Sequence, residues 1–167
     1  FPESHAASFA KLVYVSAWLK YHYPAAFTAA IINSQPMGFY APAQLIRDVR
    51  EHGIEVLPID VNHSCWDCTL EEAPSKQPNP SLRLGMRLVR GLSQIAAETI
   101  VQARTAKFRS FADLTTRAKL DRSALKRLTE ADAFGSLRLD RRSALWQALD
   151  QPPQALALFE YADTHDS

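Results

Sequence analysis

The feature that most constrains this chain is a pair of short turns between predicted helices, one around Gly91 and one at 118–120. Ser93 precedes the helical pattern after the first turn, and Asp121 precedes the pattern after the second. Serine and aspartate both favour the N-cap position, where a side-chain oxygen accepts a hydrogen bond from the first helical turn. The segment therefore predicts two helical hairpins in tandem.

The same segment is strongly basic. Residues 83–147 contain 14 Lys and Arg against 6 Asp and Glu, whereas residues 1–82 contain 5 against 8 and residues 148–167 contain none against 4. Such cationic density suits a polyanion, because each neutralised phosphate releases condensed counterions. The alternative is a solvated helical surface whose arginines only pair with acids, and we favour phosphate because acids are so outnumbered.

Two hairpins in a basic segment are suited to binding DNA without sequence specificity. Backbone N–H groups at each turn and at the following helix N-terminus can hold a phosphate, aided by the helix dipole. The predicted DNA contacts cluster around the two turns and are Arg87, Arg90, Gly91, Ser93, Arg117, Lys119, Arg122 and Lys126.

The rest of the chain predicts a mainly α fold with a small β element. Ser4 is expected to cap a first helix, and the wide apolar stripe of that helix predicts that it is mostly buried. Ser110-x-x-Asp113 predicts a capping box. The helices are expected at about 5–21, 24–33, 42–52, 93–104, 110–117, 121–131 and 140–149, with a strand at 54–59 and an antiparallel pair formed by 66–71 and 82–86.

Two further motifs carry less weight as functional sites. His63-x-Cys65-x-x-Cys68 has no second cysteine pair to complete a zinc site, so we favour a structural role. Ser4 and His5 are adjacent in a predicted helix and point in different directions, which argues against a nucleophile and its base. No carboxylates are spaced as a metal-binding set would require.

Composition excludes several classes of protein. The 167 residues include only two cysteines, too few for a disulfide scaffold. No apolar run approaches the roughly 20 residues of a membrane span. A reducing, cytoplasmic setting is therefore the expectation. The chain begins with Phe1-Pro2 and passes directly into a helical pattern, so we expect it to be part of a longer protein.

Several motifs resemble one family in the same order along nearly the whole chain. They include Ser4-His5-Ala6-Ala7, Ala17-Trp18-Leu19-Lys20, Gly53-Ile54-x-Val56 and Ala131-x-Ala133-Phe134. These residues resemble the fingers region of bacterial C-family DNA polymerases, the family of the DNA polymerase III α subunit. Residues 33–40 and 66–71 are similar to its error-prone, damage-tolerant branch.

The resemblance implies a division of the chain and roles for its parts. Residues 1–81 would be the C-terminal part of the fingers, 82–149 a tandem helix-hairpin-helix DNA-binding module, and 150–167 an acidic tail. Ser4 and His5 would lie near the incoming nucleotide, and the hairpins would hold the backbone of duplex DNA behind the active site.

The resemblance also implies an activity for the whole enzyme. Polymerases of this branch add deoxynucleotides from triphosphates during damage-induced translesion repair, using two Mg²⁺ ions held by palm carboxylates. That palm would lie upstream of Phe1, so this segment is expected to bind no cofactor of its own and to be inactive alone. The sliding clamp and an accessory polymerase-like subunit are expected partners, and a membrane is not.

Two departures from the family pattern matter. Glu3 stands where many replicative members have lysine, and an anion there would not favour a triphosphate. The first hairpin reads Gly91-Leu92-Ser93 where members often have a second glycine. If position 93 needed a positive φ, serine would be strained there. The second hairpin is therefore expected to carry more of the binding.

Two rival functions remain open. The apolar first helices could form a protein-interaction module that docks on the polymerase palm or on an accessory subunit. A zinc-bound structural domain is the third reading and ranks last. The effect of salt distinguishes DNA binding from docking on a protein, because DNA binding weakens steeply with salt and apolar docking does not.

Overall fold

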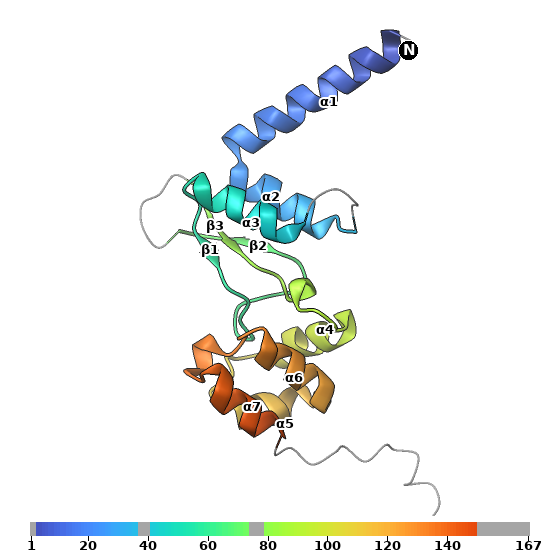
Figure 1. The fold of residues 1–167 in the computed structure, drawn as a ribbon. Helices are drawn as coiled ribbons and strands as arrows, with labels where there is room; N and C mark the ends of the chain where they lie inside the picture. The colour runs from blue at the N-terminus through green and yellow to red at the C-terminus, as the bar shows by residue number, and fades with distance from the viewer. Residues whose placement is uncertain (1–2, 37–40, 74–78, 150–167) are drawn as a thin grey trace, which may run out of the picture. The chain divides into compact units, whose positions relative to one another are not determined.

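The computed structural model describes residues 3–36, 41–73 and 79–149 (Figure 1). Contacts divide the chain into two compact units, residues 1–88 and 89–167. The described residues form seven α-helices and one three-stranded sheet, so the predicted fold class, mainly α with a small β element, is confirmed. The predicted acidic tail, 150–167, lies outside the described residues.

The first unit contains three helices, α1 (Glu3–His22), α2 (Pro24–Asn33) and α3 (Pro42–Glu51). Pro24 and Pro42 stand in the first turns of α2 and α3, where a missing N–H costs nothing. The core of this unit is formed by side chains of α2, α3 and the sheet, among them Ile32, Val49 and Leu82. α2 and α3 therefore form a compact layer on the sheet.

The prediction that the first helix is mostly buried is wrong. None of the 20 residues of α1 is buried, and large apolar side chains such as Leu12, Val13 and Tyr14 are exposed. The reason is geometric, because within the described residues α1 packs only near its C-terminal end, where Lys20 pairs with Asp48 of α3 at 2.9 Å. Ser4 lies inside α1, which begins at Glu3, and so is not its N-cap.

The sheet consists of β1 (Val56–Leu57), β2 (Thr69–Glu71) and β3 (Ser81–Arg83), in the order β1-β3-β2. β2 and β3 are antiparallel, which confirms the predicted pairing of these segments. β1 runs parallel to β3 and is shorter than the predicted strand, 54–59. Pro58 follows β1 directly and lacks the N–H that a longer ladder would need.

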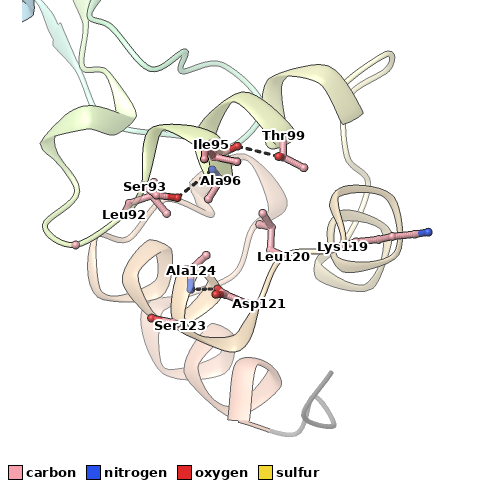
Figure 2. A pocket seen from close by; sticks show the side chains of 11 residues that line it. Leu92, Ser93, Ile95, Ala96, Thr99, Lys119, Leu120, Asp121, Ser123 and Ala124 are labelled. Atoms are coloured by element: carbon pink, nitrogen blue, oxygen red, sulfur yellow. Dashed lines mark hydrogen bonds between the residues drawn. The ribbon is translucent and has the colours of Figure 1, made fainter. Parts of the chain in front are cut away.

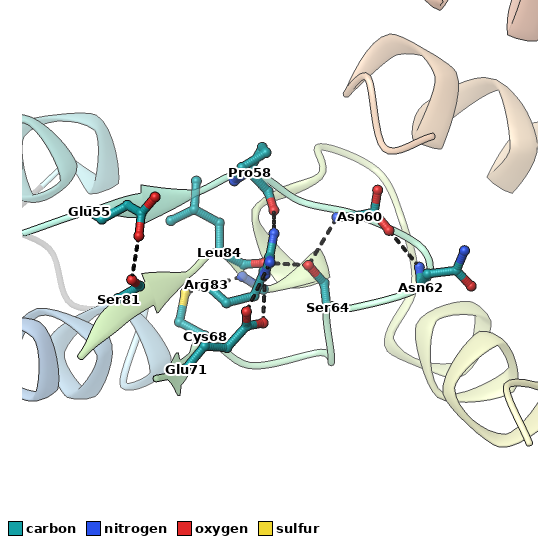
Figure 3. A network of polar contacts seen from close by, with 11 residues as sticks. Glu55, Pro58, Asp60, Asn62, Ser64, Cys68, Glu71, Ser81, Arg83 and Leu84 are labelled. Carbon is teal, nitrogen blue, oxygen red and sulfur yellow. Dashed lines mark hydrogen bonds and ion pairs between the residues drawn. The ribbon is translucent and has the colours of Figure 1, made fainter. Parts of the chain in front are cut away.

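A network of polar contacts holds the sheet together (Figure 3). The Arg83 guanidinium donates to both carboxylate oxygens of Glu71, at 2.8 and 3.0 Å, and to the Pro58 carbonyl at 2.8 Å. Hydrogen bonding to Arg83 lowers the pKa of Glu71. Arg83 is therefore a structural residue of β3.

The predicted boundary after residue 81 passes through this strand, whereas contacts group the strand with the first unit.

The second unit contains α4 (Gln94–Ala103), α5 (Phe111–Ala118), α6 (Arg122–Glu130) and α7 (Arg141–Leu149), with a 3-10 turn, η2 (Gly135–Leu137), before α7. A second 3-10 turn, η1 (Met86–Leu88), precedes this unit in the chain. Phe111 and Phe134 meet edge to face in the core, with ring centroids 5.4 Å apart. α4 packs on α5 and α6 packs on α7.

All four N-caps predicted for this unit are present. The side chains of Ser93, Ser110, Asp121 and Asp140 each accept a hydrogen bond from the backbone N–H three residues later, at 2.7 to 3.1 Å. Each cap satisfies one N–H group that would otherwise have no partner in its helix. The caps therefore set where the helices begin, and with them the positions of the two turns.

Candidate nucleic-acid interface

The first turn, 89–93, is built around one glycine. Gly91 has φ +79°, a left-handed conformation that glycine adopts at no steric cost. The N–H of Leu92 donates to the carbonyl of Val89 at 3.2 Å, and the Leu92 side chain is buried beneath the turn. Ser93 has φ −77°, so the position of the missing second glycine needs no positive φ. The expected strain at Ser93 is absent.

The second turn, 118–121, repeats this construction with different side chains. Lys119 has the left-handed φ of +46°, and its N–H donates to the Thr115 carbonyl at 3.0 Å. Leu120 is buried as Leu92 is. Asp121 caps α6 and accepts from the N–H of Ala124 at 2.7 Å. Each turn therefore runs from a left-handed residue through a buried leucine to a helix cap.

Both turns line a single cleft of about 360 Å³ (Figure 2). The N-terminal turns of α4 and α6 form its walls, so two helix N-termini meet at one site. Small side chains line much of the cleft, and Ile95 stands at its edge with 76 % of its surface exposed. The lining residues are Gly91, Leu92, Ser93, Ile95, Ala96, Thr99, Lys119, Leu120, Asp121, Ser123 and Ala124.

The two helix N-termini differ in charge. α4 is capped by the neutral hydroxyl of Ser93 and has no acidic residue in its first turn, so its dipole is not offset locally. α6 is capped by the Asp121 carboxylate, whose negative charge offsets the dipole of that helix. Lys119 supplies a cation beside the second turn, with its amino group directed away from the other labelled side chains in Figure 2. The α4 end of the cleft is therefore the better place for an anion.

Arg127 belongs to this site but is not among the eight predicted DNA contacts. A Cβ built on Gly91 would lie 3.1 Å from Nε of Arg127 and 3.4 Å from Cζ. Arg127 also pairs with Glu130 at 3.3 Å. Its guanidinium therefore lies against the backbone of the first turn, although the residue belongs to the second hairpin. No local pattern marks it, because the contact joins segments 36 residues apart.

Arg87 was predicted to contact DNA, and the structure places it in the first unit. Its guanidinium donates to the carbonyls of Asn33 and Gln35 and pairs with Asp67 at 2.6 Å. It also lies over the Trp66 ring, 6.0 Å from the centroid. Only 17 % of the side chain is exposed. These contacts join α2 to the segment before β2, and Arg87 does not line the cleft.

Arg117, like Arg87, uses its guanidinium for contacts within the protein. Its Nη2 donates to the carbonyls of Ala103 and Ala106, at 2.5 and 2.9 Å, and its Nη1 pairs with Asp113 at 3.3 Å. The guanidinium lies 4.6 Å from the centroid of the Phe108 ring. Arg117 thereby ties the C-terminal end of α4 to α5 and fixes the helix that leads into the second turn.

The remaining predicted contacts lie in or near the turns. Arg90 is exposed next to Gly91. Arg122, at the start of α6, donates to the carbonyl of Leu149 at 2.9 Å. Lys126 is exposed and lies 3.9 Å from Glu130. Of the eight predicted residues, the structure thus brings Gly91, Ser93 and Lys119 together in the lining of one cleft.

Ser4 and His5 lie in the first turn of α1, in the first unit. The Ser8 hydroxyl donates to the Ser4 carbonyl at 2.8 Å, and the His5 ring lies 4.8 Å from the Phe9 ring. Both residues are exposed. Their expected place near an incoming nucleotide stays a prediction.

The cysteine motif has a structural environment. Cys68 is buried, its sulfur accepts a hydrogen bond from the N–H of Gly85 at 3.3 Å, and burial raises the pKa of its thiol. Among residues 3–36, 41–73 and 79–149, no three His, Cys, Asp or Glu side chains come together as a metal site. In that same part of the chain, no helix is both long and apolar enough to cross a membrane.

Comparison with known proteins explains the paired turns. A family model described as "Helix-hairpin-helix motif" matches residues 53–144. The chain belongs to this helix-hairpin-helix family. The match includes both turns and all the residues that line the cleft.

The chain is also similar to proteins named for an activity. It is 55 % identical over 163 residues to "Error-prone DNA polymerase" of Brucella abortus and 51 % identical over 186 residues to "Error-prone DNA polymerase 1" of Rhizobium meliloti, with 97 % and 99 % of the chain covered. The resemblance to the error-prone branch is therefore confirmed. The chain spans 15 to 17 % of the length of these curated relatives.

Proposed function

We propose that this helix-hairpin-helix segment binds the sugar-phosphate backbone of duplex DNA as part of an error-prone DNA polymerase. The single observation that carries the proposal is that both hairpin turns open into one cleft. The family match and the names of the relatives support DNA as the partner. The segment would hold the duplex, and DNA synthesis would be the activity of the longer protein.

The geometry of the cleft suits a phosphate better than a base edge. The first N–H groups of α4 have no acceptor within the helix, and they lie where the helix dipole is positive. Ser93 and Ala96 are small, so a phosphate can approach the backbone closely. A site made of backbone N–H groups carries no code for sequence, so binding would be independent of the bases.

The cations near the turns would supply the long-range attraction. Arg90 and Lys119 are exposed beside the first and second turns, and Arg127 lies against Gly91. Arg122 and Lys126 follow on α6. These charges would raise the affinity for any duplex and make it depend on salt. Arg87 and Arg117 would act indirectly, by holding the elements to which they are bonded.

The activity of the longer protein is part of the same proposal. By resemblance, it would extend a primer with deoxynucleoside triphosphates and Mg²⁺ during repair of damaged DNA, with Ser4 and His5 near the nucleotide. Among the described residues, no three His, Cys, Asp or Glu side chains come together as a metal site, and the carboxylates that hold Mg²⁺ would belong to the palm of the longer protein. Primer extension by this segment with Mg²⁺ and all four triphosphates is expected to give no product, and clear extension would contradict this part of the proposal.

Salt dependence of duplex binding tests the role of the segment. Arg90→Gln and Lys119→Gln should each lower affinity and reduce the slope of log K against log salt by about 0.9, the value for one lost phosphate contact. Arg47→Gln and Arg50→Gln on α3 are matched controls, because they remove the same charge far from the turns in sequence. Equal slopes for all four variants would refute the phosphate role.

A second function is favoured by a specific observation on α1. Its exposed side chains include Phe9, Tyr14 and Trp18, and such a helix is more typical of a buried element than of a solvated one. We propose that α1 docks on another protein surface, either the polymerase palm or an accessory subunit. Binding of this kind would be nearly independent of salt, so the same titration separates it from binding to DNA.

A further inference from the structure

The last helix, α7, has an exposed face that the hairpins do not use. Ala144 and Ala148 are buried, and they mark the side of α7 that packs on α6. At 3.6 residues per turn, Trp146 lies on the opposite side of the helix, with Arg142 one turn before it. Trp146 is 62 % exposed. An aromatic ring and a cation therefore share the outward face of α7.

Further cations lie just before and at the start of α7. Arg138 and Arg141 are exposed just before and at the start of α7. Within the described residues, no ion pair joins Arg138, Arg141 or Arg142 to an acid at 4.0 Å or less. The nearby Asp140 uses its carboxylate to cap α7 through the N–H of Ser143, at 2.7 Å. Three arginines against the one carboxylate of Asp140 give residues 138–142 a net positive charge.

We propose that Trp146, Arg138 and Arg142 form a binding platform for single-stranded DNA. An unpaired base stacks on the indole of Trp146, while the two arginines contact phosphates of the same strand. Exposed aromatic rings set in a cationic surface bind single strands in this way without sequence preference. In a duplex, both faces of each base are covered by its neighbours, so the ring selects an unpaired strand.

This inference rests on the proposed function, because it assumes that the segment works on DNA. A polymerase that copies a template holds both duplex product and unpaired template. The cleft between the hairpin turns would serve the first form of DNA and the α7 platform the second. The two sites are built from different residues and can be removed separately.

Titration of the chain with oligo-dT, followed by tryptophan fluorescence, tests the platform. Stacking on Trp146 should quench its emission, and Trp146→Leu should abolish that quenching and weaken oligo-dT binding by at least about fivefold. Trp18→Leu is the matched control, because Trp18 is the exposed tryptophan of α1 at 43 %. That variant should keep both the quenching and the affinity.

Two more variants separate this proposal from the duplex site. Arg142→Gln should lower the salt slope for oligo-dT by about 0.7, the value for one contact on a single strand. Lys119→Gln should weaken duplex binding and leave the oligo-dT quenching unchanged. If Trp146→Leu binds oligo-dT as tightly as wild type, the platform is refuted, and the face is then free to serve as a protein contact. If neither Arg90→Gln nor Lys119→Gln changes duplex binding, the duplex proposal fails, and loss of the oligo-dT quenching in Trp146→Leu still supports the platform.

Discussion

The two hairpin turns have the same backbone design and differ in the charge of the helix cap. In each, a left-handed residue (Gly91 or Lys119) is followed by a buried leucine and then by a cap that accepts from the N–H three residues later. The first turn ends on a neutral hydroxyl and the second on a carboxylate. The helix dipole is thus open at the first turn and offset at the second.

Turn geometry and anion binding are therefore separate properties of the two hairpins. The loss of a second glycine predicts that the second hairpin dominates, whereas Ser93 sits at a negative φ and the first turn keeps its shape. Charge then decides between the turns. We expect the first hairpin to make the stronger phosphate contact, with Lys119 adding attraction at the second.

The largest expected effect comes from the anchor that holds the second hairpin against α4. Arg117→Gln removes donors to the carbonyls of Ala103 and Ala106 and the contact with Phe108. We expect the free energy of unfolding to fall by about 2 to 3 kcal/mol, since several hydrogen bonds from one charged donor group are lost and each is worth more than a neutral one. Arg109→Gln is the control, because Arg109 is exposed in the same segment and should change stability by less than about 0.5 kcal/mol. Denaturant unfolding gives both numbers, and equal values would show that Arg117 is no anchor.

The next effect tests the first turn itself. Gly91→Ala places a side chain at φ +79° and within 3.1 Å of Arg127. Gly53→Ala places an alanine at a similar left-handed φ of +77° and therefore has the same backbone strain, but no atom lies within 4 Å of the new Cβ. Each variant should lose about 1 to 2 kcal/mol of stability. Only Gly91→Ala should weaken duplex binding, by about fivefold or more.

Fluorescence anisotropy with a labelled duplex measures that affinity. The comparison with Gly53→Ala separates a local change at the turn from a general loss of stability. Equal affinities for the two variants would remove the first turn from the interface.

Exchanging the charges of the caps tests whether cap charge decides which turn binds phosphate more strongly. Asp121→Asn keeps a capping side chain and removes the carboxylate, so duplex affinity should rise by about two- to fivefold. Ser93→Asp also keeps a cap and adds a charge at the α4 end, so affinity should fall by a similar factor. If neither substitution changes the affinity, the helix N-termini do not contact phosphate.

The smallest effect concerns acid. Hydrogen bonding to the N–H of Arg109, together with the charge of Arg117, lowers the pKa of Asp113. A carboxyl group whose pKa is lowered by folding stabilises the fold above its unfolded pKa, and this contribution is lost as the pH falls through the folded pKa. Wild type should therefore lose stability below about pH 4, and Asp113→Asn should lose less over the same range. Thermal unfolding between pH 7 and pH 3 checks this, and parallel curves would contradict it.

Local signals predicted much of the second unit. Ser93, Ser110, Asp121 and Asp140 each start a helix as predicted, because a cap depends only on residues within one turn. The antiparallel pairing of β2 with β3 was also predicted from the sequence pattern. These elements place both turns, and therefore most of the candidate cleft.

Tertiary contacts account for what the sequence did not predict. Burial of α1 was inferred from its apolar side chains, yet nothing in the described residues covers most of that helix. Arg87 and Arg117 look like any other arginine in a basic segment until their carbonyl acceptors are known. The contact of Arg127 with Gly91 depends on the packing of distant segments. The density of positive charge indicates a polyanionic partner but does not show which basic side chains are available to bind it.

Amide chemical-shift mapping during titration with a short duplex tests whether both hairpin turns bind DNA in one cleft. We expect the amide signals of 91–96 and 119–124 to move together and saturate at one affinity, with larger shifts at the first turn. Added salt should reverse both sets of shifts. If these amides stay still while signals of α1 or the sheet move, the shared cleft is not where this protein holds DNA.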